Sequence, residues 1–361
     1  MLKIINLKKK LADFTLKIDD LEVCKNDYFV ILGSSGSGKT TLLEILAGFR
    51  KADMGNIYLD GEDITKKAIS DRKIVMCHGK YLFPHLSVKD NIGIGIKDKN
   101  IREERVREIS EMLGITHLLN RNPKTLSRGE QQRVALARAL VVNPKIILLD
   151  EPLNALDKLT HENLIIELKK IHESLDSTFI HVTHDFIEAI ALAKSMAIIK
   201  NGNIEQYGDV NEIINNPKNE FVARFVGYKN FLKGRIKKYG EKYIFKGDLD
   251  VIIDKIKPQK EGDAILAIRP EDIMLVGDGG CRYHYNRENI FTAEIVDVYP
   301  LSLSTVRAVV DIEGTQLVCE VIRSKANRMN LKKGKKVNIS IAYSVVLNNE
   351  AKSKNKKTNK K

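Results

Sequence analysis

The chain has 361 residues, of which 43% are hydrophobic and 30% are charged. These fractions are typical of globular proteins and exclude a wholly disordered or fibrous chain, and the length favours two or three domains. No apolar run approaches the roughly 18 residues of a membrane-spanning helix, and the basic first ten residues are too few for a signal peptide. We therefore expect a soluble, cytoplasmic protein.

The formal net charge is +13, which would suit a nucleic acid or an anionic membrane surface as partner. Six lysines and no acidic residue lie in residues 352–361, so the rest of the chain carries +7. This composition predicts a solvated, disordered tail at residues 351–361. The four cysteines form no Cys-x-x-Cys pair, so the sequence predicts neither a zinc site nor a disulfide framework.

Short apolar runs alternate with amphipathic stretches from residue 28 to about residue 208. This pattern is typical of strand–helix–strand units around a mostly parallel sheet. Asn201-Gly202 predicts a hairpin turn, and residues 85–143 are expected to be mainly helical. The sequence thus predicts an α/β domain at residues 1–227 with a helical subdomain at about 85–143. The expected strands are residues 28–32, 146–149, 179–182, 197–199 and 204–207.

The pattern changes after Pro217, where apolar residues alternate or cluster between frequent glycine turns. This pattern predicts a second, all-β region at residues 228–350, with the boundary between the two regions near residues 215–230. The expected strands are residues 231–237, 264–268, 290–298, 305–312 and 316–322, followed by a strand at 337–341.

A glycine-rich segment at residues 33–40 matches the pattern G-x-x-x-x-G-K-[ST] and lies between an apolar run and a helical segment. In such a phosphate loop the backbone N–H groups bind phosphate, Lys39 reaches the β- and γ-phosphates, and the Thr40 hydroxyl ligates Mg²⁺. The predicted nucleotide-binding residues here are Gly33, Ser34, Ser35, Gly36, Ser37, Gly38, Lys39, Thr40 and Thr41.

Two carboxylates follow the apolar run 146–149. At the carboxyl edge of the sheet, Asp150 is placed to hold Mg²⁺ through water, and Glu151 is placed to accept a proton from an attacking water. Acidic residues at strand ends also serve as helix caps, and for this motif alone that alternative stays open.

Two further segments place polar groups at the ends of elements. Ser127 and Glu130 predict a capping box that opens a helix through Leu140, and the Ser127 hydroxyl and Gly129 N–H would also suit a γ-phosphate. His184 follows the strand 179–182, where a histidine is commonly structural.

The order of these motifs is phosphate loop, Leu-Ser-x-Gly-Glu-Gln, Asp-Glu and then His, and over about residues 1–225 it resembles that of the ATP-binding cassette ATPases. The resemblance implies ATP and Mg²⁺ as cofactors and a head-to-tail homodimer. It also implies that Ser127 and Gly129 close on ATP held by the partner subunit's Lys39, and that His184 contacts the γ-phosphate. Residues 154–157 resemble the dimer-contact loop.

Three positions need separate mention within this resemblance. The family usually has Gly at the position of Arg128 and Gln at the position of His78, where the residue ligates Mg²⁺ and links the site to the membrane partner. An imidazole can accept one hydrogen bond from a metal-bound water but lacks the amide oxygen. Phe14 is the only aromatic residue before Tyr28 and is therefore the candidate for stacking on adenine, with a core position as the alternative.

Spacing discriminates among the classes of cassette ATPase. Chromosome and repair ATPases insert a long coiled coil after the phosphate loop, but only about 87 residues separate Lys39 from Ser127. Translation factors carry two cassettes and this chain carries one. We therefore expect a transporter ATPase that is peripheral at the cytoplasmic face of the membrane, with separate permease subunits, an indirect solute-binding protein and no nucleic acid. A non-transport ATPase acting on nucleic acid remains the alternative from a different class.

The C-terminal region indicates the cargo. Residues 269–273 resemble the oligonucleotide-fold-like regulatory extension of importer ATPases, and residues 291–347 resemble small molybdate/tungstate-binding modules. We interpret the cargo as molybdate or tungstate; sulfate, iron, polyamine and sugar are the alternatives. A helix cap by Ser324 at residues 325–331 and solvated basic side chains are the structural alternatives. The candidate oxyanion-binding residues, which offer hydroxyl and cationic donors, are Ser302, Ser304, Arg323, Ser324 and Lys325.

Overall fold

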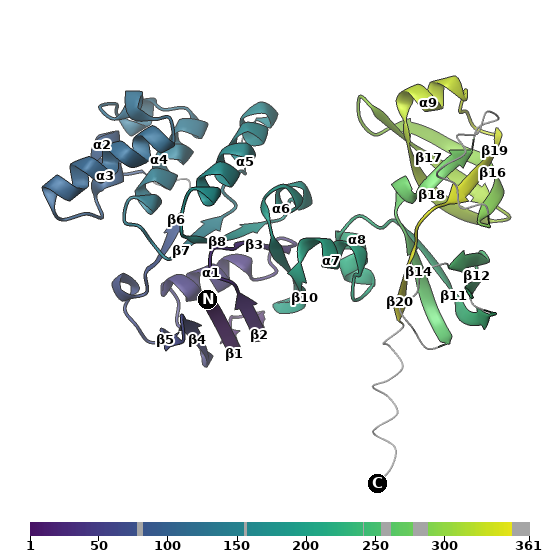
Figure 1. The fold of residues 1–361 in the computed structure, drawn as a ribbon, viewed down its shortest axis with the longest axis horizontal. Coiled ribbons are helices and arrows are strands. Elements are labelled where there is room, and N and C mark those ends of the chain that lie inside the picture. The colour runs from purple at the N-terminus through teal and green to yellow at the C-terminus, as the bar shows by residue number, and fades with distance from the viewer. Residues whose placement is uncertain (78–81, 155–156, 241, 254–260, 277–287, 349–361) are drawn as a thin grey trace, which may run out of the picture. The chain divides into compact units, whose positions relative to one another are not determined.

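A computed structural model of the chain describes residues 1–77, 82–154, 157–240, 242–253, 261–276 and 288–348. It contains two compact units, Met1–Ile213 and Ile214–Lys361, which we call unit 1 and unit 2 (Figure 1). Among the described residues, none of the helices has both the length and the apolar composition needed to cross a membrane.

The described residues of unit 1 form a ten-stranded sheet in the order β5-β4-β1-β2-β10-β9-β3-β8-β7-β6. Its second half is parallel from β9 to β6. These strands are short and almost wholly buried because helices cover a parallel sheet on both faces. Each expected strand of this region is present. The parallel strands are β3 (Tyr28–Gly33), β6 (Ile74–Cys77), β7 (Ile146–Asp150), β8 (Thr178–Thr183) and β9 (Ser195–Lys200).

The other half of the sheet contains β10, which was expected at residues 204–207, and four strands that the sequence pattern did not predict; β6 of the parallel half was not predicted either. β1 and β2 pair in an antiparallel manner, and β4 pairs with β1. The predicted hairpin is confirmed, because Asn201 and Gly202 adopt positive φ angles of 46° and 78° and join β9 to β10. These strands are β1 (Leu2–Lys10), β2 (Thr15–Val23), β4 (Met54–Leu59), β5 (Glu62–Asp63) and β10 (Asn203–Asp209).

Helices follow the strands as expected for an α/β domain. Residues 85–143 are mainly helical, as predicted, and α2, α3 and α4 form a group of their own in Figure 1. A capping box of Ser127 and Glu130 opens α4, which confirms that prediction. The helices are α1 (Lys39–Ala47), α2 (Val88–Gly93), α3 (Lys99–Met112), α4 (Arg128–Leu140), α5 (Lys158–Glu173), α6 (Phe186–Leu192) and α7 (Val210–Asn215), with 3-10 turns η1 (Ile69–Asp71), η2 (Thr116–Leu118) and η3 (Pro123–Thr125).

Unit 2 is built mainly of strands. Its described residues form two five-stranded antiparallel sheets, β13-β12-β11-β14-β20 and β15-β19-β16-β17-β18, which share one apolar core. Every expected strand is present, whereas β12, β13, β15 and β20 were not predicted. The strands are β11 (Asn230–Tyr239), β12 (Lys242–Gly247), β13 (Val251–Ile253), β14 (Gly262–Ile268), β15 (Ile273–Val276), β16 (Ile290–Pro300), β17 (Thr305–Ile312), β18 (Thr315–Ile322), β19 (Lys336–Ile341) and β20 (Val345–Asn348).

Short helices complete unit 2: α8 (Glu220–Phe225), η4 (Pro270–Asp272) and α9 (Arg323–Arg328). α9 begins two residues before the predicted helix, and its N-cap residue is Ile322, without a side-chain cap. The alternative in which Ser324 caps this helix is therefore wrong, because Ser324 lies inside the first turn.

Candidate nucleotide-binding and hydrolysis site

The phosphate loop is the turn between β3 and α1. Gly36 and Gly38 have φ angles of 76° and 100°, which glycine adopts at little cost. A Cβ atom at Gly33 would lie 2.6 Å from the side chain of Ile199, so a larger residue does not fit there. α1 begins at Lys39 without a side-chain cap, which leaves the first backbone N–H groups of α1 available to phosphate oxygens.

Lys39 is held over this loop. Its Nζ atom donates hydrogen bonds to the carbonyl oxygens of Gly33 (2.8 Å) and Ser34 (3.0 Å). Burial lowers the pKa of Lys39, while the nearby carboxylates of Glu151 and Asp150 act in the opposite direction. The loop thus holds a pre-positioned ammonium group beside two carboxylates.

Thr40 and Asp150 meet at the carboxyl end of β7. The Thr40 hydroxyl donates to Oδ1 of Asp150 over 3.1 Å. Hydroxyl and carboxylate oxygens are the hard ligands that Mg²⁺ prefers, so this pair fits the predicted metal. His78, the third predicted metal ligand, lies outside the described residues.

Glu151 follows Asp150 in a strained backbone conformation. Its φ angle is 45°, and its N–H donates to the Val182 carbonyl oxygen over 2.9 Å, which fixes this residue at the ends of β7 and β8. Oε1 of Glu151 lies 3.5 Å from Nδ1 of His184, and His184 is more than half exposed. The structure thus brings Lys39, Thr40, Asp150, Glu151 and His184 to one edge of the sheet.

Asn154 is a site residue whose role the sequence pattern missed. Its side-chain amide donates a hydrogen bond to Oε2 of Glu151, so the carboxylate is held from two sides, by Asn154 and His184. The only signal for it is its position three residues after Glu151, in the segment that resembles the dimer-contact loop. Ala155 and Leu156 of that segment lie outside the described residues.

Phe14 lies beside the phosphate loop. It is half-buried and packs against the core, and a Cβ atom at Gly38 would lie 2.5 Å from its ring. Its contacts therefore serve the core, and its ring also borders the predicted nucleotide site.

Ser127 and Gly129 occupy the start of α4. The Ser127 hydroxyl accepts from the Glu130 N–H (3.3 Å), and the Ser127 N–H donates to the Glu130 carboxylate (2.7 Å). This backbone hydrogen bond, together with the Ser127 hydroxyl, lowers the pKa of Glu130. In the described part of the chain these contacts stay within the capping box, and no hydrogen bond joins Ser127 to the phosphate loop.

In unit 2, three of the predicted oxyanion-binding residues lie together. The hydroxyls of Ser302 and Ser304 are 3.2 Å apart. Arg323 donates from its backbone N–H to the Ser304 carbonyl oxygen (2.8 Å) and from Nη2 to the Ser302 carbonyl oxygen (2.6 Å). Nε of Arg323 is buried and has no hydrogen-bond partner among the described residues. Ser324 and Lys325 follow in α9, where Ser324 is exposed.

Comparison with known families finds one family model in each unit. Residues 16–154 match the ABC transporter family model, and residues 286–347 match the TOBE domain model. The molybdate/tungstate import ATP-binding protein WtpC of Pyrococcus horikoshii is 39% identical, with 96% of this chain and 99% of that protein aligned. The spermidine/putrescine import ATP-binding protein PotA of Protochlamydia amoebophila is also 39% identical, over 81% of this chain and 79% of that protein.

Solved structures share the fold of unit 1. A nucleotide-free ATP-binding cassette from an ABC transporter aligns with a TM-score of 0.57 and 26% identity, over 62% of this chain and 98% of that one. A dimeric cassette in a post-hydrolysis state, bound to ADP and Pi, aligns with a TM-score of 0.51 and 30% identity, over 58% of this chain and 99% of that one. Fold and site thus define a phosphate-loop ATPase. The chain belongs to the ATP-binding cassette import ATPases, which hydrolyse ATP to drive transport.

Proposed function

We propose that this chain energises the import of molybdate or tungstate, as a homodimer that works on separate transmembrane permease subunits at the cytoplasmic face of the membrane. The observation that carries the solute assignment is the extent of the similarity to WtpC, which spans 96% of the chain and includes unit 2. The polyamine importer ATPase covers 81%, and it makes polyamine import the second candidate.

In this proposal Glu151 is the general base of hydrolysis. Its carboxylate lies at the sheet edge beside the phosphate loop, and Asn154 and His184 hold its two oxygens in place. Lys39 binds the β- and γ-phosphates, and Thr40 and Asp150 would hold Mg²⁺, which neutralises charge that develops on the phosphates. His184 is exposed enough to reach the γ-phosphate.

Ser127 and Gly129 act on the second nucleotide site of the dimer. Their capping-box geometry leaves Ser127 and Gly129 at a helix start that suits a phosphate group. The dimeric arrangement of the related cassette that binds ADP and Pi supports a site completed by the partner subunit. Arg128 lies between them and adds a cation close to the phosphates.

Regulation by the oxyanion is assigned to unit 2. A tetrahedral dianion needs several N–H and O–H donors, and Ser302, Ser304 and Arg323 supply hydroxyls and a guanidinium within one cluster. Nε of Arg323 is a buried donor without a described partner, which supports an acceptor from outside the chain. Bound oxyanion would shift the dimer toward its separated arrangement in proportion to its differential affinity for the two arrangements.

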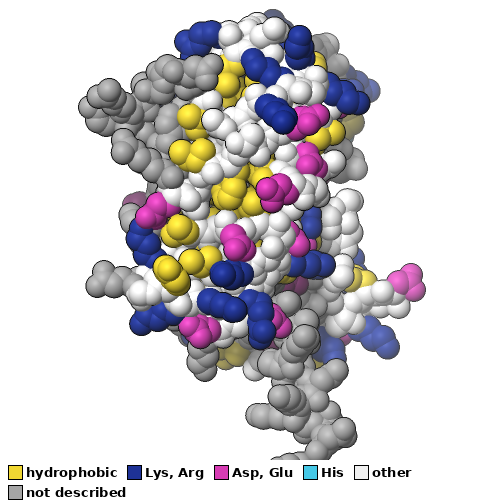
Figure 2. Space-filling model, turned by 90° about the vertical axis from the view of Figure 1, so that its right-hand side faces the viewer, with side chains coloured by type: hydrophobic (Ala, Val, Ile, Leu, Met, Phe, Trp, Pro, Cys, Tyr) yellow, Lys and Arg dark blue, Asp and Glu magenta, His cyan; other side chains and the backbone are white. Residues whose placement is uncertain are grey.

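The face of the molecule shown in Figure 2 gives little support to the alternative of a nucleic-acid partner. On the face shown in Figure 2, lysine and arginine side chains are interspersed with acidic and hydrophobic side chains. A nucleic-acid site requires basic residues gathered on one face or along a helix.

Calorimetry on the full chain tests the solute assignment. We expect heat of binding with tungstate or molybdate and none with spermidine. Binding of spermidine without binding of either oxyanion would replace this proposal by polyamine import. Sulfate serves as the matched control, because it is also a tetrahedral dianion and tests whether the cluster selects among oxyanions.

A further inference from the structure

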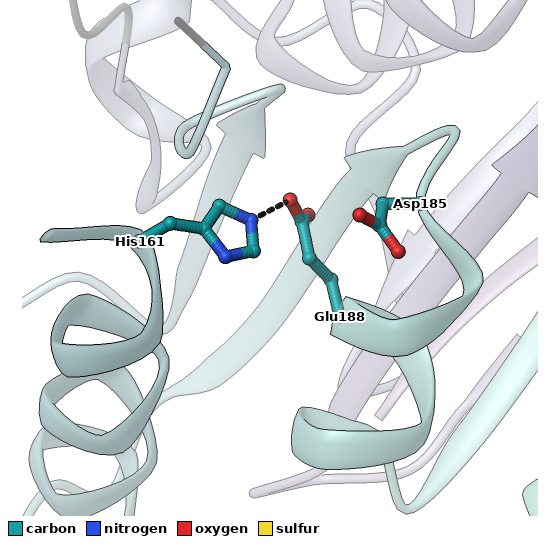
Figure 3. A group of neighbouring side chains, drawn as sticks. All are labelled: His161, Asp185 and Glu188. Carbon is teal, nitrogen blue, oxygen red and sulfur yellow. Dashed lines mark hydrogen bonds and ion pairs between the residues drawn. The ribbon is translucent and has the colours of Figure 1, made fainter. Parts of the chain in front are cut away.

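A second group of ligating side chains contains none of the residues that the hydrolysis site uses, although one of its members directly follows His184. His161 comes from the first turn of α5, and Asp185 and Glu188 come from the start of α6 (Figure 3). One ligand atom from each of the three residues lies within 4.8 Å of the other two. We call these three residues the α5–α6 triad.

Glu188 is the unusual member of the triad because its carboxylate is almost fully buried, with 4% of the side chain exposed. Oε1 lies 2.8 Å from Nε2 of His161, and Oε2 lies 3.3 Å from Nε2 of His181. In the described part of the chain, the ion-pair partners of Glu188 are these two histidines. Burial acts to raise the pKa of Glu188, but interactions with the side chains of His181, Thr183 and His161 outweigh it, and the pKa is lowered. A bound cation would supply this buried carboxylate with a full counter-charge.

His181 contacts the other carboxylate oxygen of Glu188. Its side chain is fully buried, and its Nδ1 atom lies 3.1 Å from the Tyr28 hydroxyl. Nε2 of His181 and Oε2 of Glu188 are both buried and lie 3.3 Å apart, and their contact does not have the geometry of a full hydrogen bond. Oε2 of Glu188 thus faces His181, while Oε1 faces His161 at the triad.

Asp185 contributes the second carboxylate in a fixed position. One of its oxygens, Oδ1, accepts the Ile187 N–H over 2.7 Å and so caps α6, and its own N–H donates to the Thr183 hydroxyl over 3.0 Å. The backbone and Oδ1 are therefore held, while Oδ2 has no hydrogen bond in the described structure and is available as a ligand.

We propose that the α5–α6 triad binds a first-row divalent transition-metal ion, with Zn²⁺ as the best match. One imidazole nitrogen and two carboxylate oxygens form a mixed set that suits Zn²⁺, whereas Mg²⁺ and Ca²⁺ prefer oxygen ligands alone. Two carboxylates balance the charge of the ion. His181, whose Nδ1 atom contacts the Tyr28 hydroxyl, positions the Glu188 carboxylate through the contact of its Nε2 atom with Oε2.

Such an ion would connect two segments of the hydrolysis machinery. α5 starts directly after residues 154–157, and Asp157 caps it by accepting from the Thr160 N–H over 3.1 Å. Asp185, the N-cap residue of α6, directly follows His184. A metal shared by His161, Asp185 and Glu188 therefore fixes the first turns of both helices relative to each other, and with them the chain next to Asn154 and His184.

The experiment measures Zn²⁺ binding to the full, nucleotide-free chain by calorimetry, after removal of any affinity tag and treatment with a chelator. We expect one site per chain, and at least a ~10-fold loss of affinity in both His161→Gln and Asp185→Asn, since even residues that only support metal ligands are worth 10- to 100-fold. Asp185→Asn retains an oxygen that can accept the Ile187 N–H. His117→Gln, which changes an exposed histidine elsewhere, should bind as the wild type does.

A spectroscopic measurement separates this site from adventitious binding. Co²⁺ added in place of Zn²⁺ should give visible absorption bands of a low-coordinate site, and these bands should be absent from His161→Gln while its circular dichroism matches that of the wild type. Wild-type affinity in both ligand variants, or no Zn²⁺ binding by the wild type at submillimolar concentrations, would overturn the proposal.

Discussion

The hydrolysis site of unit 1 and the group of Ser302, Ser304 and Arg323 in unit 2, which we call the Ser302–Arg323 cluster, place their polar groups in different ways. In unit 1 the groups lie at the ends of adjacent buried strands and at the start of α1, so the sheet fixes their positions. In unit 2 the serines lie on an exposed turn between β16 and β17. Arg323, which directly follows β18, donates hydrogen bonds to their carbonyl oxygens. A site on buried strand ends is marked by local sequence motifs, whereas a site on a turn is made by tertiary contacts. Substitutions in the hydrolysis site should therefore abolish ATP hydrolysis, and substitutions in the Ser302–Arg323 cluster should alter the regulation of ATP hydrolysis.

The largest effect is expected for Glu151→Gln. A positioned general base contributes about 10²- to 10⁴-fold, while ATP affinity depends on the phosphate loop. ATP hydrolysis should therefore fall by that factor, and ATP binding should persist and trap an ATP-bound dimer. Steady-state hydrolysis and equilibrium binding measured on one preparation check both parts. Glu173→Gln, at an exposed position near the end of α5, serves as the control; turnover of Glu151→Gln within about tenfold of the wild type would remove Glu151 from this role.

The second effect concerns unit 2. With a coupling of about 1–3 kcal/mol, saturating tungstate or molybdate should lower the ATPase rate of the assembled transporter about 5- to 150-fold. Arg323→Gln should abolish this response without changing the rate in the absence of oxyanion, because the residue lies outside the hydrolysis site. Arg328→Ala, an exposed arginine on the same helix, should respond as the wild type does. An unchanged response in Arg323→Gln would show that the cluster is structural.

A smaller effect is expected for Phe14, which borders the phosphate loop without belonging to it. Stacking of an aromatic ring on a base is worth about 1–3 kcal/mol, so Phe14→Ala should raise the dissociation constant for ATP about 5- to 150-fold. Phe14→Tyr should retain affinity, since the ring remains. Binding of ATP and of inorganic triphosphate by each variant separates the two possible roles: a loss shared by both ligands indicates damage to the loop through the core.

The smallest effect concerns the stability of unit 2. Burial raises the pKa of Asp272 to about 6. The nearby charge of Glu271 also raises this pKa, while Arg269 acts in the opposite direction. Because the folded-state pKa lies above the ordinary value of 3.8 for an aspartate, the folded chain binds a proton more readily than the unfolded chain. Stability therefore increases as the pH falls from above 6 toward 4, and the increase is lost as the pH rises through 6.

Asp272→Asn should accordingly stabilise unit 2 by about 1–2 kcal/mol at pH 7 and remove this part of the pH dependence. Scanning calorimetry of the full chain between pH 5 and about pH 7.5 measures the difference from the wild type. Asp250→Asn, at an exposed position in unit 2, is the matched control. Parallel pH profiles for the wild type and Asp272→Asn would contradict the assignment.

Sequence patterns captured those parts of the fold whose signal is local. The buried runs that became β3, β7 and β8, the Asn201-Gly202 hairpin and the Ser127–Glu130 capping box were all predicted, because each depends on residues within a few positions. The strands β1 and β2 were missed. They are amphipathic, and β1 has charged residues on its exposed positions, so neither gives the continuous apolar run of a buried parallel strand.

Contacts between distant segments were beyond such patterns. Asn154 reaches Glu151 only because the backbone turns sharply at Glu151. His161 meets Glu188 only because α5 and α6 pack together. Ser324 was placed at a helix start by its residue type, but the chain enters α9 directly from β18, so the cap position falls on Ile322.

Uptake by liposomes that contain the permease and this chain tests the central claim most directly. Labelled tungstate, supplied with its binding protein outside and ATP inside, should accumulate with the wild-type chain and fail to accumulate with Glu151→Gln. Spermidine should not enter under the same conditions. Accumulation of tungstate that is equal with both chains, or uptake of spermidine in place of tungstate, would contradict the account.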